Sequence, residues 1–204
     1  MSRAIYLASR SPRRRELLAQ IGVRFEPLLF REGARADPET SEDALPGEAP
    51  GDYVRRVARA KAAAAWQRVL MRKGLRRMPA LAADTTVALG DEILGKPADR
   101  ADAERILGAL SGTRHRVLTA VAVAFEGRLE MAVSESLVTF GELSAERIRA
   151  YAQTGEPYDK AGAYGIQGRA GAFVGRLEGS YTGVMGLPLF ETAALLREFG
   201  VAVP

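Results

Sequence analysis

Lysine is rare in this sequence, and the places where it occurs point to phosphate chemistry. The chain has 204 residues and only four lysines, because nearly every other basic position is arginine. Three of them, Lys61, Lys96 and Lys160, lie beside alanine, Gly-Pro and aspartate respectively. A compact ammonium group suits a phosphoryl oxygen, so these three are candidate phosphate ligands. The alternative is that so few lysines fall in such places by chance.

Asp84 is the most informative carboxylate, since it directly follows the apolar residues 80–83. A charge in that position is costly unless it is paired or bound to a cation. We predict a central strand over 79–89 whose carboxyl end carries Asp84, Thr85 and Thr86. An ionised aspartate at a strand end can bind Mg²⁺ or orient water. Alternatively, Asp84 caps the next turn, and Thr85 is an ordinary β-branched strand residue.

The hydroxyl-rich segment of residues 9–13 has the features of an anion-binding loop. Ser11 and Pro12 suit the N-cap and first position of a helix, whose backbone donors collect anions. Arg13 adds a planar fork for phosphate or a base edge, and Ser9 adds a hydroxyl. Three successive arginines oppose the helix dipole, so we expect a negative group nearby. The alternative is a capped helix start with a solvated basic first turn.

Two further polar residues, Gln167 and His115, favour different roles, ligand contact and structural support respectively. Gln167 lies between Gly165-Ile166 and Gly168, so a flat ligand can approach the backbone while the amide offers both a donor and an acceptor. A plain turn is the alternative for this tetrapeptide. His115, the only histidine, begins a predicted strand directly after a turn and has no acidic neighbour in the sequence, which favours a structural role.

Composition excludes several classes of function. There is no cysteine and only one histidine, which excludes a disulfide scaffold, a cysteine nucleophile and a Cys/His zinc site, so any metal must be held by oxygen. The glycines form neither a P-loop nor a dinucleotide fingerprint. With 29 basic and 25 acidic residues the net charge is +4, which favours a local anionic ligand over a nucleic-acid coating. No signal-peptide core or membrane-spanning segment is evident, so we expect a cytoplasmic protein without a membrane partner.

The elements that must position these residues alternate between helix and strand. We expect a buried strand at 5–8, a helix from Pro12 to Gly22, a long loop over 31–50, and a helix from Asp52 to Gly74 with Lys61 beside its apolar stripe. After the central strand we expect a short strand at 92–94, a helix over 103–110, a hairpin of 117–125 with 129–140, a helix after Ser144, and a last helix through 187–199. This order predicts a mixed α/β sheet.

Several motifs together resemble the Maf nucleotide pyrophosphatases, from near Ile5 to Leu195. They are Tyr6-Leu7-Ala8-Ser9, Ser11-Pro12-Arg13-Arg14, Ala58-Arg59-Ala60-Lys61-Ala62, Ala83-Asp84-Thr85, Gly95-Lys96-Pro97 and Asp159-Lys160-Ala161-Gly162-Ala163-Tyr164-Gly165-Ile166-Gln167-Gly168. The resemblance implies a fold similar to inosine triphosphatases, a mixed sheet with flanking helices in two lobes around a cleft. Residues 1–204 would then form a single domain whose two lobes share the sheet.

The resemblance also implies an activity, the hydrolysis of a nucleoside triphosphate to the monophosphate and pyrophosphate with a divalent cation, Mg²⁺ or Mn²⁺. The motif around Gln167 and the pairing of Arg13 with Thr85 resemble the branch that acts on dTTP and UTP. By this resemblance Asp84 is the proton acceptor, Lys61 and Lys96 hold the phosphates, Arg13, Thr85 and Gln167 set base specificity, and Ser9 and Arg13 contact phosphate.

The metal site implied by the family is harder to place, because the loop after Phe25-Glu26 is longer than in similar proteins. Counting back from Gly47-Glu48 makes Glu42 the best match for the acidic metal ligand, together with Asp84. Glu32, Glu39 and Asp43 are alternatives.

Two other functions stay open from the sequence. One is a pyrophosphatase of the same fold acting on 7-methyl-GTP, ITP or XTP. The other is a non-catalytic regulator of cell division that binds nucleotide or nucleic acid, which the basic surface could support, although no aromatic-basic pattern for single strands is present. The family resemblance also makes a homodimer a possible assembly.

Overall fold

A single mixed sheet organises the computed structural model, which describes residues 4–30 and 41–203. The strand order is β2-β1-β3-β5-β6-β7, and β4 pairs with β3 outside that path. The strands are β1 (Ala4–Leu7), β2 (Arg24–Pro27), β3 (Ala80–Leu89), β4 (Glu92–Leu94), β5 (Arg114–Phe125), β6 (Arg128–Phe140) and β7 (Val174–Glu178). Because β1 is parallel to β2 and β3 while the other pairs are antiparallel, the predicted mixed α/β fold is confirmed.

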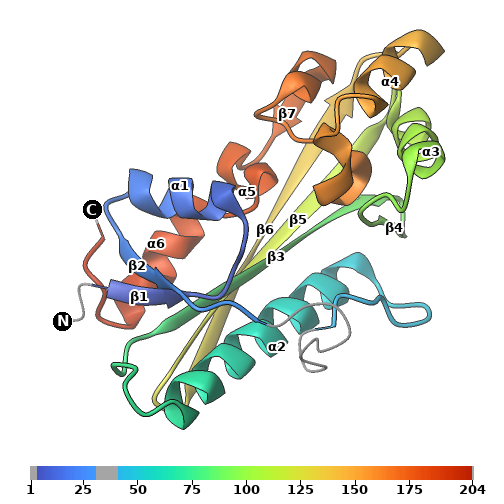
Figure 1. The fold of residues 1–204 in the computed structure, drawn as a ribbon. Coiled ribbons are helices and arrows are strands. Elements are labelled where there is room, and N and C mark those ends of the chain that lie inside the picture. The colour runs from blue at the N-terminus through green and yellow to red at the C-terminus, as the bar shows by residue number, and fades with distance from the viewer. Residues whose placement is uncertain (1–3, 31–40, 204) are drawn as a thin grey trace.

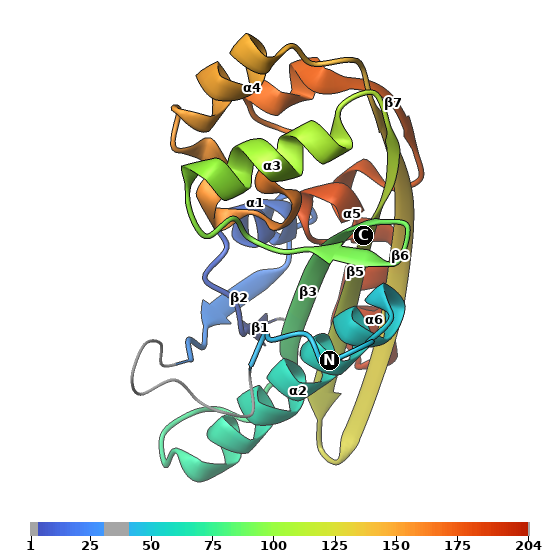
Figure 2. The same ribbon diagram turned by 90° about the vertical axis from the view of Figure 1, so that its right-hand side faces the viewer.

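Helices cover both faces of this sheet (Figure 1). They are α1 (Pro12–Gln20), α2 (Pro50–Met71), α3 (Arg100–Leu110), α4 (Ala145–Ala152), α5 (Tyr181–Met185) and α6 (Leu189–Glu198), with 3₁₀ turns η3 (Glu156–Asp159), η4 (Ala161–Ala163) and η5 (Arg169–Phe173). One apolar cluster lies between α2 and the sheet, and a second lies between the opposite face and helices α1 and α6. A third joins α3 and α4 to the far ends of β3, β5 and β6 (Figure 2).

Successive side chains of β3 point to opposite faces of the sheet. Ala80 and Ala82 pack in the α2 cluster, whereas Leu81 and Ala83 pack in the cluster of α1 and α6. Since strand side chains alternate with a period of two, Asp84 follows on the α2 side and Thr85 on the α1 side. One strand therefore delivers a carboxylate and a hydroxyl to two different sets of partners.

The prediction that Asp84 lies at the carboxyl end of its strand is wrong, because β3 continues to Leu89. What changes near Asp84 is the pairing of β3 with its neighbouring strands β1 and β4. Strand β1 pairs with β3 only as far as Leu81, and β4 begins to pair at Val87. Within the described residues, no strand covers this edge of β3 between those two points. The sheet is interrupted beside the polar residues, and the strand itself is not.

Most other predicted elements are confirmed with shifted ends. The long helix begins at Pro50 rather than Asp52 and ends at Met71, before Gly74. Ser144 caps α4 by accepting a hydrogen bond from the backbone of Arg147 at 3.3 Å. The sequence did not indicate β2, β7, α5 or the three 3₁₀ turns. Residues 41–49 contain no helix or strand, as predicted for that part of the 31–50 loop, and 31–40 lie outside the described residues.

The last helix begins at Leu189, so Leu187 precedes it, and Phe190 in its first turn is 85% exposed. None of the helices in the described ranges combines the length and the apolar character that crossing a bilayer requires. That the whole chain forms one domain of two lobes stays a prediction.

Candidate active site

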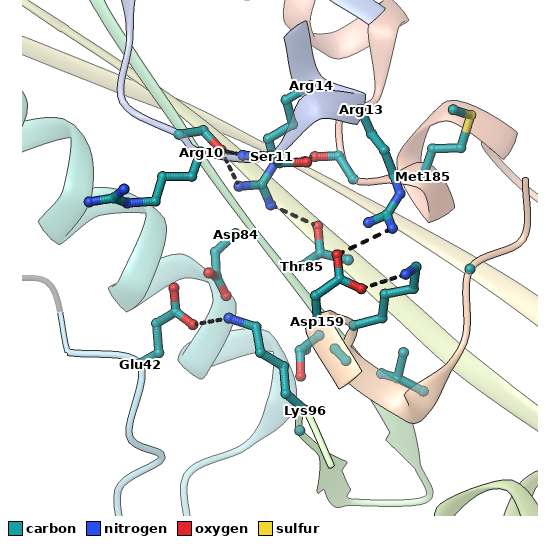
Figure 3. A pocket seen from close by; sticks show the side chains of 18 of the residues that line it. Arg10, Ser11, Arg13, Arg14, Glu42, Asp84, Thr85, Lys96, Asp159 and Met185 are labelled. Atoms are coloured by element: carbon teal, nitrogen blue, oxygen red, sulfur yellow. Dashed lines mark hydrogen bonds and ion pairs between the residues drawn. The ribbon is translucent and has the colours of Figure 1, made fainter. Parts of the chain in front are cut away.

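A cavity of about 970 Å³ opens at the interrupted edge of β3 (Figure 3). Its walls come from the loop between β1 and α1, from α2, from β3, and from the glycine-rich segment that follows η3. Every residue selected from the sequence for a site role lines this cavity: Ser9, Arg13, Glu42, Lys61, Asp84, Thr85, Lys96 and Gln167. Of the alternative acidic residues, Asp43 also lines it, whereas Glu32 and Glu39 lie outside the described residues.

Four side chains of alternating charge form a row along one wall. Lys61 projects from the buried face of α2, opposite the face of β3 that carries Asp84. Its Nζ donates to Asp84 Oδ1 at 2.8 Å and to Glu42 Oε1 at 2.6 Å. Lys96 Nζ donates to Glu42 Oε2 at 2.9 Å. With Lys61 only 8% exposed, the two carboxylates compensate a charge that would otherwise be costly to bury.

The carboxyl group of Asp84 is the most deeply buried carboxylate of this charged row, which we define as Asp84, Lys61, Glu42 and Lys96. It is 5% exposed, and burial raises its pKa despite the attraction of Lys61. Its second oxygen, Oδ2, has no hydrogen-bond partner in the described part of the chain. A buried carboxylate with an available oxygen and a raised pKa suits proton transfer or cation binding.

Glu42 responds differently to the same lysines. Burial acts to raise its pKa, but Lys61 and Lys96 outweigh burial and lower that pKa to about 2. The carboxylate therefore stays ionised at neutral pH. Neighbouring Asp43 instead accepts a hydrogen bond from the hydroxyl of Ser41 at 2.9 Å.

The charged row fits a divalent cation held only partly by protein. In the ranges that the structure covers, no three histidine, cysteine or acidic side chains gather closely enough to hold a metal ion by themselves. Two carboxylates are nevertheless what Mg²⁺ commonly takes from a protein when phosphate oxygens and water complete its shell. The unpartnered Oδ2 of Asp84 and the ionised Glu42 meet that requirement.

Arg14, which the sequence did not single out as a site residue, makes the hydrogen bonds of the opposite wall. Its guanidinium donates to Ser9 Oγ and Thr85 Oγ1, each at 3.2 Å, and to the carbonyl oxygen of Gly186 at 2.8 Å. Burial lowers its pKa. The available signal was helical spacing, because Arg14 precedes the buried pair Leu17 and Leu18 by three and four positions.

Arg13 points elsewhere, as successive helix residues must. Its Nη2 lies 3.6 Å from Asp159 Oδ2, and the arginine that bonds Thr85 is Arg14. Arg13 and Thr85, the pair that the resemblance links to base specificity, thus have different partners, and both line the cavity. Figure 3 shows Arg13 reaching from α1 towards Asp159 on the glycine-rich segment.

The hydroxyl of Thr85 has a fixed polarity. Thr119 has one hydroxyl proton, which it donates to the carbonyl of Gly183 at 2.8 Å. The 2.9 Å contact between the two threonine hydroxyls must therefore use the proton of Thr85. Since Arg14 donates to one lone pair of Thr85, a single acceptor position is left on that hydroxyl. Thr85 can accept a hydrogen bond from a ligand but cannot donate one.

The glycine-rich segment forms a part of the cavity wall whose chemistry differs from that of the charged row. Gln167 has an exposed side chain there. Lys160 also lines the cavity, but its Nζ donates to the carboxylate of Asp159 and the main-chain carbonyl of Glu156. Lys160 therefore holds this segment in place, and its role as a phosphate ligand stays a prediction.

His115 has the structural role that its sequence context predicts. It is buried, with Nε2 2.9 Å from the hydroxyl oxygen of Tyr164, and it packs edge-on against the rings of Tyr164 and Phe140. Burial lowers its pKa to about 4, so the imidazole is neutral near pH 7. The pair supports the cavity from behind, because Tyr164 itself lines it.

Chemically, the cavity is matched to a long ligand with two different ends. The charged row can hold a polyanion and a cation. Arg13, Thr85 and Gln167, which line the same cavity, offer donors and one fixed acceptor to a flat polar group.

Comparison with known proteins shows extensive similarity. The family model described as Maf-like protein matches residues 4–199. A protein of Dechloromonas aromatica named dTTP/UTP pyrophosphatase is 60% identical over 196 residues, which cover 96% of this chain and 97% of the relative. One of Cupriavidus metallidurans with the same name is 58% identical over 201 residues, covering 98% and 99%. A solved HAM1 protein from Coxiella burnetii matches with a TM-score of 0.50 at 17% identity, over 97% of this chain and 100% of that one, and shows a shared fold.

Proposed function

This chain belongs to the Maf family, and from that premise we propose that it hydrolyses dTTP and UTP to the monophosphate and pyrophosphate. The observation that carries the proposal is a buried Asp84 with an unpartnered oxygen, ion-paired with Lys61, in a chain 60% identical over 196 residues to a dTTP/UTP pyrophosphatase. Nearly full coverage of the relatives supports transfer of the reaction to this chain.

Cleavage between the α and β phosphorus atoms requires neutralised phosphate oxygens and an activated water. In this proposal Lys61 and Lys96 bind phosphate oxygens, and Asp84 accepts the proton of the water that attacks the α-phosphorus. The raised pKa of Asp84 suits a proton acceptor. Ser9 and Arg13 assist in phosphate binding at the start of α1.

A divalent cation, Mg²⁺ or Mn²⁺, belongs to the proposed reaction. When bound, it would supply charge neutralisation and polarise a phosphoryl oxygen. Asp84 and Glu42 would hold it. Because Glu42 also accepts from both lysines, it would keep the cation and the phosphate-binding ammonium groups together.

Base selection would follow from the other end of the cavity. Uracil and thymine present O2, N3–H and O4, an acceptor, a donor and an acceptor. Thr85 has only an acceptor left, which suits N3–H, while Arg13 and Gln167 can donate to the carbonyl oxygens. Cytosine lacks the proton on N3 and carries an amine in place of O4, so its polar groups would stay unpaired.

A panel of nucleoside triphosphates tests this function. We expect pyrophosphate release from UTP and dTTP with Mg²⁺ or Mn²⁺, and little from CTP, ITP or 7-methyl-GTP. Faster release from ITP or 7-methyl-GTP would keep the chemistry and overturn the base assignment. A silent panel, together with salt-dependent nucleic-acid binding in the absence of metal, would favour the non-catalytic alternative.

Three further features belong to the proposal as predictions. They are a cytoplasmic location, a homodimer, and a single domain over residues 1–204. Gel filtration with light scattering would test the assembly, and limited proteolysis would test the domain organisation.

A further inference from the structure

We propose that Glu156 is a positioning residue for Gln167, and that its carboxylate fixes the backbone from which this exposed side chain reads the base. The inference rests on the proposed function, in which Gln167 contacts the base. It concerns a residue that does not touch the substrate and acts through the main chain.

Glu156 joins helix α4 to the backbone just after Gln167. Its Oε1 accepts the hydroxyl of Tyr151 at 2.9 Å, and its Oε2 accepts the N–H of Arg169 at 3.2 Å. Tyr151 is buried in α4, and burial together with Glu156 raises its pKa, so the hydroxyl keeps its proton and remains a donor. The carboxylate therefore ties the chain directly after Gly168 to a rigid, buried partner.

Gly168 shows how closely this carboxylate approaches the loop. A Cβ atom at this position would lie 2.2 Å from Glu156 Oε1. The φ of Gly168 is −100°, which any residue can adopt, so backbone conformation does not demand glycine. A Cβ here would instead displace the carboxylate of Glu156, which occupies that space.

The glycine on the other side of Gln167 is held in a similar way. A Cβ at Gly165 would lie 2.7 Å from Lys160 Cε. Lys160 in turn donates to the main-chain carbonyl of Glu156 and to the carboxylate of Asp159. Side chains from η3 and the residue after it thus press on both glycines that flank Gln167.

The same turn also reaches the second base-reading residue. Asp159, the last residue of η3, lies 3.6 Å from the guanidinium of Arg13 across the cavity. Because Glu156 and Asp159 belong to one short turn, η3 sets the position of Gln167 relative to Arg13. Loss of the Glu156 carboxylate should loosen this alignment without touching the charged row.

Substitutions at Glu156 test the inference in the full-length protein. We expect Glu156→Ala to lower the ratio of kcat/KM for UTP to that for CTP by roughly tenfold, the effect of one lost hydrogen bond to a charged group. The loss should appear in KM for UTP, with kcat for CTP unchanged. Glu156→Gln keeps an acceptor for Tyr151 but not for Arg169, so it should fall between Glu156→Ala and the wild type.

Hydrogen exchange supplies a readout that does not depend on activity. The amides of 165–169 should exchange faster in Glu156→Ala. An unchanged exchange rate at Arg169 would overturn the proposed tie, and faster exchange with an unchanged UTP to CTP ratio would overturn the positioning role.

Gly168→Ala provides a reciprocal test, with Gly108→Ala in α3 as its control because no atom lies within 4 Å of the added Cβ there. Gly168→Ala should lower both Tm and the UTP to CTP ratio in the wild-type background. It should leave Tm unchanged in the Glu156→Ala background, where the carboxylate is gone. Equal losses of Tm in both backgrounds would contradict the inference.

The proposed function fails separately from this inference. A wild-type protein without preference for UTP over CTP would overturn the proposed base reading, and the Glu156 role with it, before any variant is compared. A wild-type preference that survives in every Glu156 variant would overturn only the role of Glu156.

Discussion

The two ends of the cavity are built in different ways. In the charged row, Lys61 on α2 and Asp84 on β3 are almost fully buried, whereas Glu42 and Lys96 lie outside the helices and strands and are partly exposed. At the proposed base-reading end, Gln167 is exposed and follows short turns, whereas Arg13 lies on α1 and Thr85 on β3. One end therefore derives its properties from burial, and the other from a local arrangement of backbone and side-chain hydrogen bonds.

This difference has consequences for substitutions. Removing Lys61 or Asp84 from the charged row leaves a buried opposite charge without this partner, which is among the costliest changes in a protein. Removing a member of the base-reading end loses one hydrogen bond near solvent. The first kind of change should affect turnover and folding together, and the second should affect substrate choice.

The largest effect is expected for Asp84→Asn. An amide cannot accept the proton of the attacking water, so kcat should fall by about 10²–10⁴-fold, the usual contribution of a general base. Pyrophosphate release from UTP measures this directly. The matched control is Asp91→Asn, a fully exposed aspartate in a turn, which should keep wild-type turnover. Near-normal turnover in Asp84→Asn would remove this residue from the proposed mechanism.

Lys61→Met should destabilise the fold as well as abolish turnover. It leaves Asp84 buried without its ion pair, and breaking such a pair costs roughly 3–5 kcal/mol. Urea unfolding gives the free energy of unfolding for comparison with Lys73→Met, where the lysine is exposed. Equal stability of the two variants would mean that the charged row contributes little to the fold.

His115 offers a test of a buried side chain that is uncharged in the folded protein. Its pKa falls from 6.5 to about 4 on folding, so between these values the unfolded chain binds a proton that the folded chain does not. Stability should therefore rise with pH across this window by up to about 3 kcal/mol and become flat above it. As His115 is the only histidine, His115→Phe should remove this part of the pH dependence. Parallel stability curves for the two proteins in urea would contradict the neutral assignment.

The smallest effect is expected for Gln167→Ala. It should lower kcat/KM for UTP by about tenfold through the loss of one hydrogen bond, and leave CTP turnover unchanged. Steady-state kinetics with both substrates measure the change. A similar loss with CTP would show that Gln167 does not discriminate between the bases.

The charged row could largely be anticipated from the sequence, since burial and charge leave a clear pattern. An isolated aspartate in an apolar strand and a lysine beside an apolar helix face predicted Asp84 and Lys61 correctly as neighbours of the cavity. What could not be read was the interruption of the sheet beside Asp84, because it depends on where β1 and β4 stop pairing. Pairing between distant strands leaves no local signal.

The base-reading end was only partly predictable. Glycines around Gln167 indicated a close backbone approach, but the reason at Gly168 is the carboxylate of Glu156, twelve positions earlier in the chain. Arg14 was hidden among three consecutive arginines, and only its spacing from the buried leucines of α1 separates it from its neighbours. Short turns are set by such tertiary contacts, which composition and periodicity do not reveal.

The division between the two ends can be tested most directly with one matched pair of variants. We would measure kcat/KM for UTP and CTP in the wild type, in Lys96→Ala and in Gln167→Ala. Lys96→Ala should lower both values by the same factor and leave their ratio unchanged, whereas Gln167→Ala should lower the ratio. A changed ratio in Lys96→Ala, or an unchanged one in Gln167→Ala, would contradict the account.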